Sequence, residues 1–179
     1  METHYLKITP LVFLLLISRL WTNARADLVE DACSQVSTGN YDLCISSLRS
    51  DPSTNTSTDV KGLAYVMLGV LNANATAIVS RASELLNKTD ESVIQQCLDD
   101  CAIGYSKVTA DFIKLAYGFL NSSDYGSAVD QTSSMVETAE DCEDCFVGPP
   151  SVRKSPITAA NNVFEKLATI AGDIIAILG

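Results

Sequence analysis

The chain has 179 residues, 47% of them hydrophobic, and its 12 Lys and Arg stand against 22 Asp and Glu, which gives a formal net charge of −10. An excess of acidic groups excludes the basic face that nucleic-acid phosphates require, so no nucleic-acid partner is expected. The length suits one domain that buries roughly two thirds of its unfolded surface.

Residues 1–26 are predicted to be a cleaved secretory signal peptide. Lys7 precedes a short apolar run at 11–17, and an Ala-x-Ala cleavage site follows at 24–26. The run is too short to span a bilayer, and no second run approaches about 20 residues, so we expect a secreted protein without a membrane segment. Cleavage would remove His4, the only histidine, which excludes histidine metal ligands and histidine-activated nucleophiles.

Residues 27–52 are predicted to form a helical hairpin. Cys33 and Cys44 flank a turn at 37–40 that contains Gly and Asn. A disulfide between them would stabilise the hairpin by a nominal ~3 kcal/mol through loop-closure entropy. The polar linker at 51–57 contains Pro52, which disfavours continuation of a helix.

Three helical patterns come next. The first runs from about Thr58 to Leu86, with apolar residues spaced by threes and fours. The second is the most regular in the chain, and its stripe is Ile94, Leu98, Cys101, Tyr105, Val108, Phe112, Leu115 and Phe119. The third repeats this spacing at Tyr125, Ala128, Thr132, Met135, Ala139, Cys142 and Phe146.

The fourth helix is predicted to begin with Ser155 as its N-cap and Pro156 at its first helical position. Its apolar stripe is Ala159/Ala160, Val163, Leu167, Ile170, Ile174 and Leu178. Hardly any segment alternates as a strand would, and the connections are short. The sequence therefore predicts an all-α fold, in which residues 58–179 form an up-and-down four-helix bundle beside the disulfide-stapled N-terminal hairpin.

Six cysteines in a secreted chain predict disulfides, with 15 possible pairings. Cys101 and Cys142 lie on the apolar stripes of two helices that would run antiparallel, so a bridge between them is geometrically natural. Cys97, one turn earlier in its helix, and Cys145, one turn later in the other, could form a parallel third bridge. The alternatives are two free thiols at Cys97 and Cys145, or a four-cysteine metal site, because the Cys-x3-Cys and Cys-x2-Cys spacings resemble ligand pairs.

Four Asn-x-Ser/Thr sequons could accept N-linked glycans, at Asn55, Asn74, Asn87 and Asn121. Asn87 and Asn121 lie at predicted helix ends and are expected to be the most accessible. Asn74 lies near the edge of an apolar helix face, where a glycan is least expected.

Several motifs follow one another in a recognisable order. They are Cys33…Tyr41-Asp42-Leu43-Cys44 with Asp51-Pro52, Asp100-Cys101-Ala102-Ile103-Gly104-Tyr105, Asp124-Tyr125, Cys142-Glu143-Asp144-Cys145-Phe146, and the ending from Ser155-Pro156 to Leu178-Gly179. Together they resemble the plant invertase and pectin methylesterase inhibitor family, and in particular its invertase inhibitor branch. The resemblance spans essentially all of residues 27–179.

The resemblance implies a four-helix bundle with a helical hairpin, the disulfides Cys33–Cys44 and Cys101–Cys142, and stoichiometric inhibition without catalysis or a cofactor. The expected partner is acid invertase (β-fructofuranosidase), bound 1:1 and non-covalently in the apoplast and cell wall, or in the vacuole. Pectin methylesterase is the alternative target, and a non-inhibitory secreted bundle is the second alternative. Cell-wall invertase inhibitors of the family carry Pro-Lys-Phe near the start of the third bundle helix, where this chain reads Gly126-Ser127-Ala128-Val129.

Polar residues on the second and third bundle helices are candidate partner contacts, namely Lys107, Asp111, Asp130 and Gln131. Carboxylate pairs such as Asp99-Asp100 and Glu143-Asp144 could in principle act as acids and bases. On helix faces that point to solvent they are interpreted as a solvated surface. The chain is therefore predicted not to be an enzyme and to hold no metal.

Overall fold

The computed structural model describes residues 28–148 and 153–179, so the predicted signal peptide at 1–26 lies outside the described residues. The described part is helical and contains no strand. Helical residues 28–33, α2 (Tyr41–Ser50) and the 3-10 helix η1 (Pro52–Thr56) precede the bundle. The bundle is built from α3 (Val60–Leu86), α4 (Ser92–Lys107), the π-helical segment η2 (Val108–Phe112), α5 (Ile113–Asn121), α6 (Tyr125–Val147) and α7 (Thr158–Ala176).

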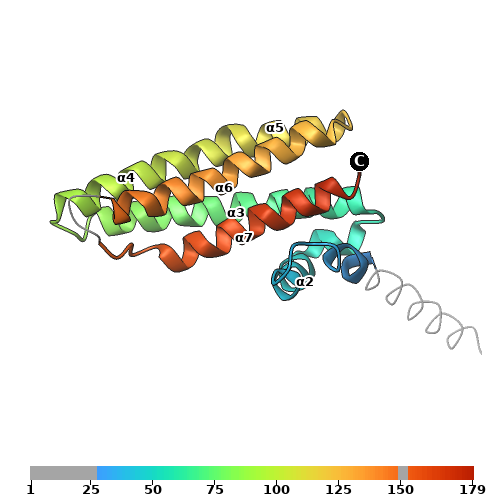
Figure 1. Ribbon diagram of the computed structural model, residues 1–179, viewed down its shortest axis with the longest axis horizontal. Coiled ribbons are helices and arrows are strands. Elements are labelled where there is room, and N and C mark those ends of the chain that lie inside the picture. The colour runs from blue at the N-terminus through green and yellow to red at the C-terminus, as the bar shows by residue number, and fades with distance from the viewer. Residues whose placement is uncertain (1–27, 149–152) are drawn as a thin grey trace, which may run out of the picture.

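The predicted four-helix bundle is confirmed, with α4, η2 and α5 together forming its second helix (Figure 1). Helix α3 packs on α4 and α7, and α6 packs on α7, α4 and α5. Side-chain caps begin two of the helices, because the Asp59 carboxylate accepts the backbone N–H of Gly62 and that of Asp124 accepts the N–H of Ser127.

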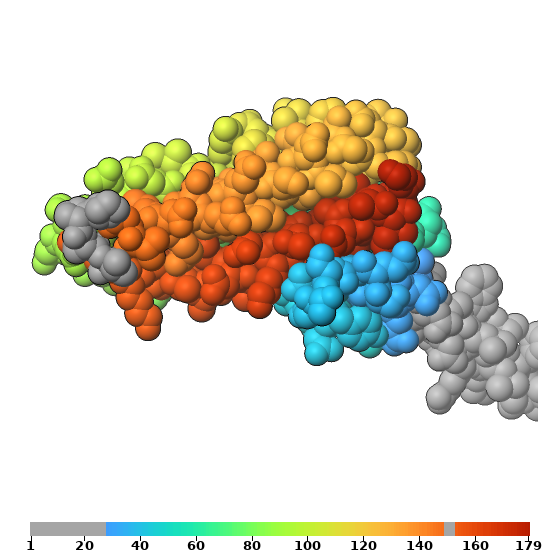
Figure 2. All heavy atoms as spheres, viewed as in Figure 1, coloured from blue at the N-terminus to red at the C-terminus, as the bar shows by residue number. Residues whose placement is uncertain are grey.

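The N-terminal hairpin lies against α7 near the C-terminal end of the chain, as both Figure 1 and Figure 2 show. Gly39, at φ +91°, makes the turn that returns the chain to α2. The Asp173 carboxylate of α7 accepts both the backbone N–H and the hydroxyl of Ser37, each at 2.8 Å. This double hydrogen bond attaches the turn of the hairpin to the bundle.

All six cysteines are paired. The bridges are Cys33–Cys44 in the hairpin and the neighbouring pairs Cys101–Cys142 and Cys97–Cys145 between α4 and α6. The two bridges between α4 and α6 have Cα–Cα distances of 4.9 and 5.5 Å, within the range that disulfides require. No cysteine sulfur is therefore left as a thiolate for a metal or as a free thiol.

The second helix departs from the prediction beyond Val108. In η2 the backbone N–H of Ile113 bonds the carbonyl of Val108, five residues earlier rather than four. The extra residue rotates the rest of the helix, so Ile113, Ala116 and Leu120 are buried. The predicted core position Leu115 is wrong in consequence, because its side chain is 47% exposed. Phe112 and Phe119 are half-buried and pack against the edge of the core.

The fourth helix also differs from its prediction. Helix α7 begins at Thr158, because Pro156 and Ile157 form a turn in which the hydroxyl of Ser155 accepts the N–H of Ile157. The predicted stripe fails in its first two turns, where Ala159, Ala160 and Val163 are exposed and Asn161 and Phe164 are buried instead. The later positions Leu167, Ile170 and Ile174 are buried as expected.

A polar network explains why Asn161 points inward. Its amide oxygen accepts a hydrogen bond from the Tyr105 hydroxyl, and its amide nitrogen donates to the carbonyl of Ala139 at 2.7 Å. The Tyr105 ring also meets Phe164 edge to face, with 4.8 Å between ring centroids. These contacts join α4, α6 and α7 through groups that would be costly to bury unpaired.

Helix α3 is, among the described residues, the one helix long and apolar enough to cross a membrane by length and composition. The expectation that no second apolar segment reaches that length was therefore wrong, because isolated polar residues such as Asn72 and Asn74 interrupt the run without lowering its average enough. Helices in the core of a bundle also have this length and apolar composition. Nine residues of α3 are buried in the bundle.

The nested bridges between α4 and α6 predict non-additive stability. Once one bridge exists, the other closes only a small ring, whereas the first closes a long loop worth about 4 kcal/mol nominally. We expect the quadruple variant (alanine at Cys97, Cys101, Cys142 and Cys145) to lose more unfolding free energy than the two double variants combined. Denaturant unfolding in a double-mutant cycle measures this coupling. Strictly additive losses of unfolding free energy would contradict the predicted coupling between the two bridges.

The buried Tyr105 predicts a loss of stability in alkali. Burial first, and then the charges of Glu143 and Glu165, raise the pKa of Tyr105 above its usual value of 10.0. The contribution of the buried Tyr105 to the free energy of unfolding is present below pH 10. It is lost as the pH rises further, because the unfolded chain then releases the phenolic proton and the folded chain does not. In alkaline denaturant titrations, Tyr105→Phe should flatten this decline, whereas Tyr41→Phe, at an exposed site, should leave it unchanged.

Candidate functional site

The rotation introduced by η2 places apolar side chains on the surface of the bundle. Phe112, Leu115 and Phe119 line a groove of about 640 Å³ on the outer side of η2 and α5. The other residues that line this α5 groove are Lys107, Ala110, Asp111, Lys114, Gly118 and Ser122. An apolar strip bordered by charged side chains has the composition of a protein-binding surface.

Two lysines border the strip on a chain whose net charge is −10. The ammonium of Lys107 lies 5.0 Å from the centroid of the Phe112 ring, a cation–π geometry that holds it over the groove. Lys114 lies on the same side, and Asp111 is the one carboxylate among the lining residues. The α5 groove by itself therefore carries more positive than negative charge on an otherwise acidic molecule.

A second groove, of about 550 Å³, adjoins the first between α4 and α6. Lys107 and Phe112 line both grooves, so the two are continuous. The wall from α6 carries Ser134, Glu137, Thr138 and Asp141. At Gly104 a Cβ would lie 3.0 Å from the Thr138 methyl, so the missing side chain allows α4 and α6 to approach closely here. We call the two grooves together the π-segment face.

The predicted contact residues are only partly brought together. Lys107 and Asp111 line the π-segment face. Asp130 and Gln131 lie on α6 outside the lining of either groove, although they precede Ser134 by one turn and so approach its edge. Asp130 is exposed and Gln131 is half-buried.

The spacing of apolar residues predicted the apolar part of this face to be core. A signal was available, because residues 112–120 carry two complete stripes side by side: Phe112, Leu115 and Phe119 in one, and Ile113, Ala116 and Leu120 in the other. Only one stripe can face the bundle. Two apolar stripes on one helix thus indicate that one of them remains at the surface.

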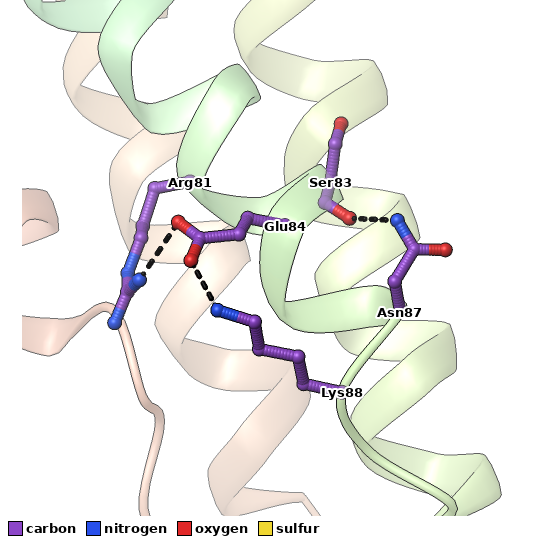
Figure 3. Close-up of polar contacts among 5 residues, drawn as sticks. All are labelled: Arg81, Ser83, Glu84, Asn87 and Lys88. Atoms are coloured by element: carbon purple, nitrogen blue, oxygen red, sulfur yellow. Dashed lines mark hydrogen bonds and ion pairs between the residues drawn. The ribbon is translucent and has the colours of Figure 1, made fainter.

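Glu84 is a carboxylate whose surroundings do not suit acid–base catalysis. Glu84 accepts hydrogen bonds from Lys88 and from Arg81 on the exposed end of α3 (Figure 3). These two partners lower the pKa of Glu84, which is opposite to the shift that a general acid needs. Within the described residues, no group of three or more potential metal ligands is placed to hold an ion.

The described residues form a helical bundle that three disulfides cross-link and that carries the two grooves on its surface. The family model for plant invertase/pectin methylesterase inhibitors matches residues 27–174. The chain therefore belongs to the plant invertase/pectin methylesterase inhibitor family, whose members are inhibitors rather than enzymes.

Curated relatives carry names for both targets. A Platanus acerifolia protein named "Putative invertase inhibitor" is 27% identical and is matched over 86% of this chain and 87% of its own length. The Arabidopsis thaliana "Cell wall / vacuolar inhibitor of fructosidase 2" is 32% identical over 74% of each chain. "Pectinesterase inhibitor 28" of Oryza sativa subsp. japonica is also 32% identical, over 86% of this chain and 70% of its own.

The fold is shared with solved structures. The crystal structure of a mutant form of a pectin methylesterase inhibitor from Arabidopsis superposes with a TM-score of 0.67. The match covers 82% of this chain and 94% of the other, at 20% identity. The match shows that the two chains share the fold of a helical bundle.

The π-helical segment predicts which residue can be deleted. Removing the exposed Ala110 should convert η2 to a regular α-helix and keep Ile113, Ala116 and Leu120 buried, so stability should change little. Removing the exposed Asp99 from the same long helix should rotate Cys97 away from Cys145 and destabilise the fold. Thermal unfolding followed by circular dichroism compares the melting temperatures of the two variants. Equal losses of melting temperature would contradict the placement of the extra residue in η2.

Proposed function

We propose that this protein inhibits a plant carbohydrate-active enzyme, acid invertase (β-fructofuranosidase) in the first place, by forming a 1:1 non-covalent complex. Membership of the inhibitor family over residues 27–174 is the observation that carries this proposal. Disulfides that cross-link both the hairpin and the bundle support it, since a rigid inhibitor loses little conformational entropy on binding.

We infer that the π-segment face contacts the enzyme. Leu115 and the half-buried Phe112 and Phe119 can lose further water on docking, which favours association. Lys107 and Lys114 suit an acidic rim, because glycoside hydrolases place a pair of carboxylates in their substrate cleft. Lys107 and Asp111 belong to this surface, and Asp130 and Gln131 would extend it along α6.

The proposed site of action is outside the cytoplasm. Residues 1–26 carry the features of a cleaved signal peptide, and three disulfides form and persist in oxidising compartments. One relative is named for the cell wall and the vacuole. We therefore place the mature inhibitor, with its hairpin at 27–52 and its bundle at 58–179, in the cell wall, with the vacuole as the alternative.

Pectin methylesterase is the second candidate target, and one local feature favours it. Where cell-wall invertase inhibitors resembling this chain carry Pro-Lys-Phe, the first turn of α6 has an exposed Gly126 and a buried Ala128. A Cβ added at Gly126 would meet nothing within 4 Å. This turn therefore presents no bulky side chain to an invertase.

A non-inhibitory ligand carrier is the weakest alternative. The centre of the bundle is occupied by fully buried side chains such as Leu71, Tyr105, Met135 and Phe164. The described grooves lie at the surface and are better suited to a macromolecule than to an enclosed small molecule.

Inhibition assays test both the target and the surface. Oxidised wild-type protein is mixed with purified acid invertase and, separately, with pectin methylesterase at acidic pH. Leu115→Glu should weaken inhibition of the sensitive enzyme by about tenfold or more, ~1.4 kcal/mol, because it buries a charge in an apolar contact. Val163→Glu, at a residue 40% exposed on α7, is the matched control and should leave inhibition unchanged.

The outcomes separate the two parts of the proposal. Failure of the wild-type protein against several isoforms of both enzymes would refute the inhibitory function. Inhibition that survives Leu115→Glu would instead retain the function and show that another surface makes the contact. Circular dichroism of each variant establishes that the bundle has folded.

A further inference from the structure

The four sequons differ in how the structure holds their side-chain amides. Asn74 is half-buried in the middle of α3, and Asn55 is exposed in η1. Asn87 is exposed and caps the end of α3, and Asn121 is the exposed last residue of α5. A glycan is attached at the amide nitrogen Nδ2, so the surroundings of this atom decide which site can carry one in the folded protein.

Two of these nitrogens are turned back onto the helix. Nδ2 of Asn74 donates to the carbonyl of Val70 at 2.9 Å. Nδ2 of Asn87 donates to the carbonyl of Ser83 at 3.0 Å, as Figure 3 shows. A sugar on either nitrogen would have to be accommodated against the helix backbone, and at Asn74 also against its half-buried surroundings.

Asn121 has the opposite orientation. Its oxygen Oδ1 accepts a hydrogen bond from the Tyr65 hydroxyl at 2.5 Å, and Nδ2 donates to no group among the described residues. Tyr65 is itself held in place, because its ring stacks on Tyr117 with 5.7 Å between centroids and the Tyr117 hydroxyl donates to its carbonyl. The amide is thus fixed by its oxygen, with its nitrogen left unbonded at the surface.

The backbone at this sequon is a well-formed turn. The N–H of Asp124 bonds the carbonyl of Phe119, and the N–H of Ser123 bonds that of Leu120, which together end α5 in a Schellman motif. Ser123, the third residue of the sequon, adopts φ 59° in this turn. Asn121 therefore lies at an exposed helix end beside a turn, where a large substituent displaces no packed side chain.

From this geometry we propose that Asn121 is an N-glycosylation site, and that Asn74 carries no glycan. The donor is a lipid-linked oligosaccharyl diphosphate of the secretory pathway. A bond forms between Asn121 Nδ2 and C1 of the first sugar while the bond from C1 to the diphosphate oxygen breaks. The lipid diphosphate leaves with the electrons of that bond, and the proton lost from Nδ2 passes to solvent. Oδ1 keeps its lone pairs and therefore its bond to Tyr65.

The glycan at Asn121 would border the π-segment face. Ser122, the next residue, lines the α5 groove together with Phe119 and Leu115. Lys107 and Phe112 line the same groove from the other end of this helical segment, about two to four turns before Asn121.

Peptide mapping of the full chain secreted from plant cells tests this assignment. Enzymatic release of N-glycans in heavy-oxygen water should label residue 121 and should leave residue 74 unlabelled. By intact mass, Asn121→Gln should remove one glycan, and Asn74→Gln should remove none. Recovery of unmodified Asn121 from the wild-type protein, or a label at residue 74, would overturn the proposal.

Ser123→Gly provides the matched variant. It destroys the sequon while leaving Asn121 and its bond to Tyr65 in place, and glycine adopts positive φ without strain, so the turn should be preserved. We expect the same loss of one glycan as for Asn121→Gln, with an unchanged circular dichroism spectrum. Full retention of mass in Ser123→Gly would show that the lost glycan was not attached through this sequon.

Discussion

The pair of disulfides between α4 and α6 is the constraint on which the rest of the bundle depends. Cys97–Cys145 and Cys101–Cys142 lie one turn apart and join the same two helices, so they fix the rotation of each helix as well as its position along the other. With that rotation fixed, Tyr105 points into the bundle, where Asn161 binds its hydroxyl. The covalent and polar contacts thereby specify one arrangement of α4, α6 and α7.

The π-helical segment reconciles this fixed rotation with the packing of α5. A continuous α-helix would turn Phe112 and Leu115 inward, but the extra residue in η2 brings Ile113 and Leu120 to the core instead. The displaced apolar side chains then form the surface groove that we assign to partner binding. The same local irregularity thus supports both the core and the candidate site, which is common for π-bulges at functional positions.

The features proposed for function lie along one helix of the bundle. Lys107 precedes the π-helical segment, Leu115 follows it, and Asn121 ends α5 with its amide held by Tyr65. A partner surface and a glycan would therefore be neighbours rather than independent additions. Rigidity at both ends, from the disulfides and from the Schellman turn, presents them in a fixed geometry.

The sequence by itself predicted the helices and the hairpin, because apolar spacing is a local property of the chain, and its motifs resembled the family. It favoured the three cysteine pairs but left free thiols and a metal site open as alternatives, which the three bridges exclude. It also placed Lys107 and Asp111 among the candidate contacts. Only the tertiary structure decided which of two adjacent stripes faces inward after Val108, and that Asn161 rather than Val163 is buried. Both choices depend on atoms from other helices. The amide of Asn161 bonds Tyr105 of α4 and Ala139 of α6, and the stripe that faces inward after Val108 is the one that packs against α3 and α6. The spacing of residues along one helix gives no information on these contacts with other helices.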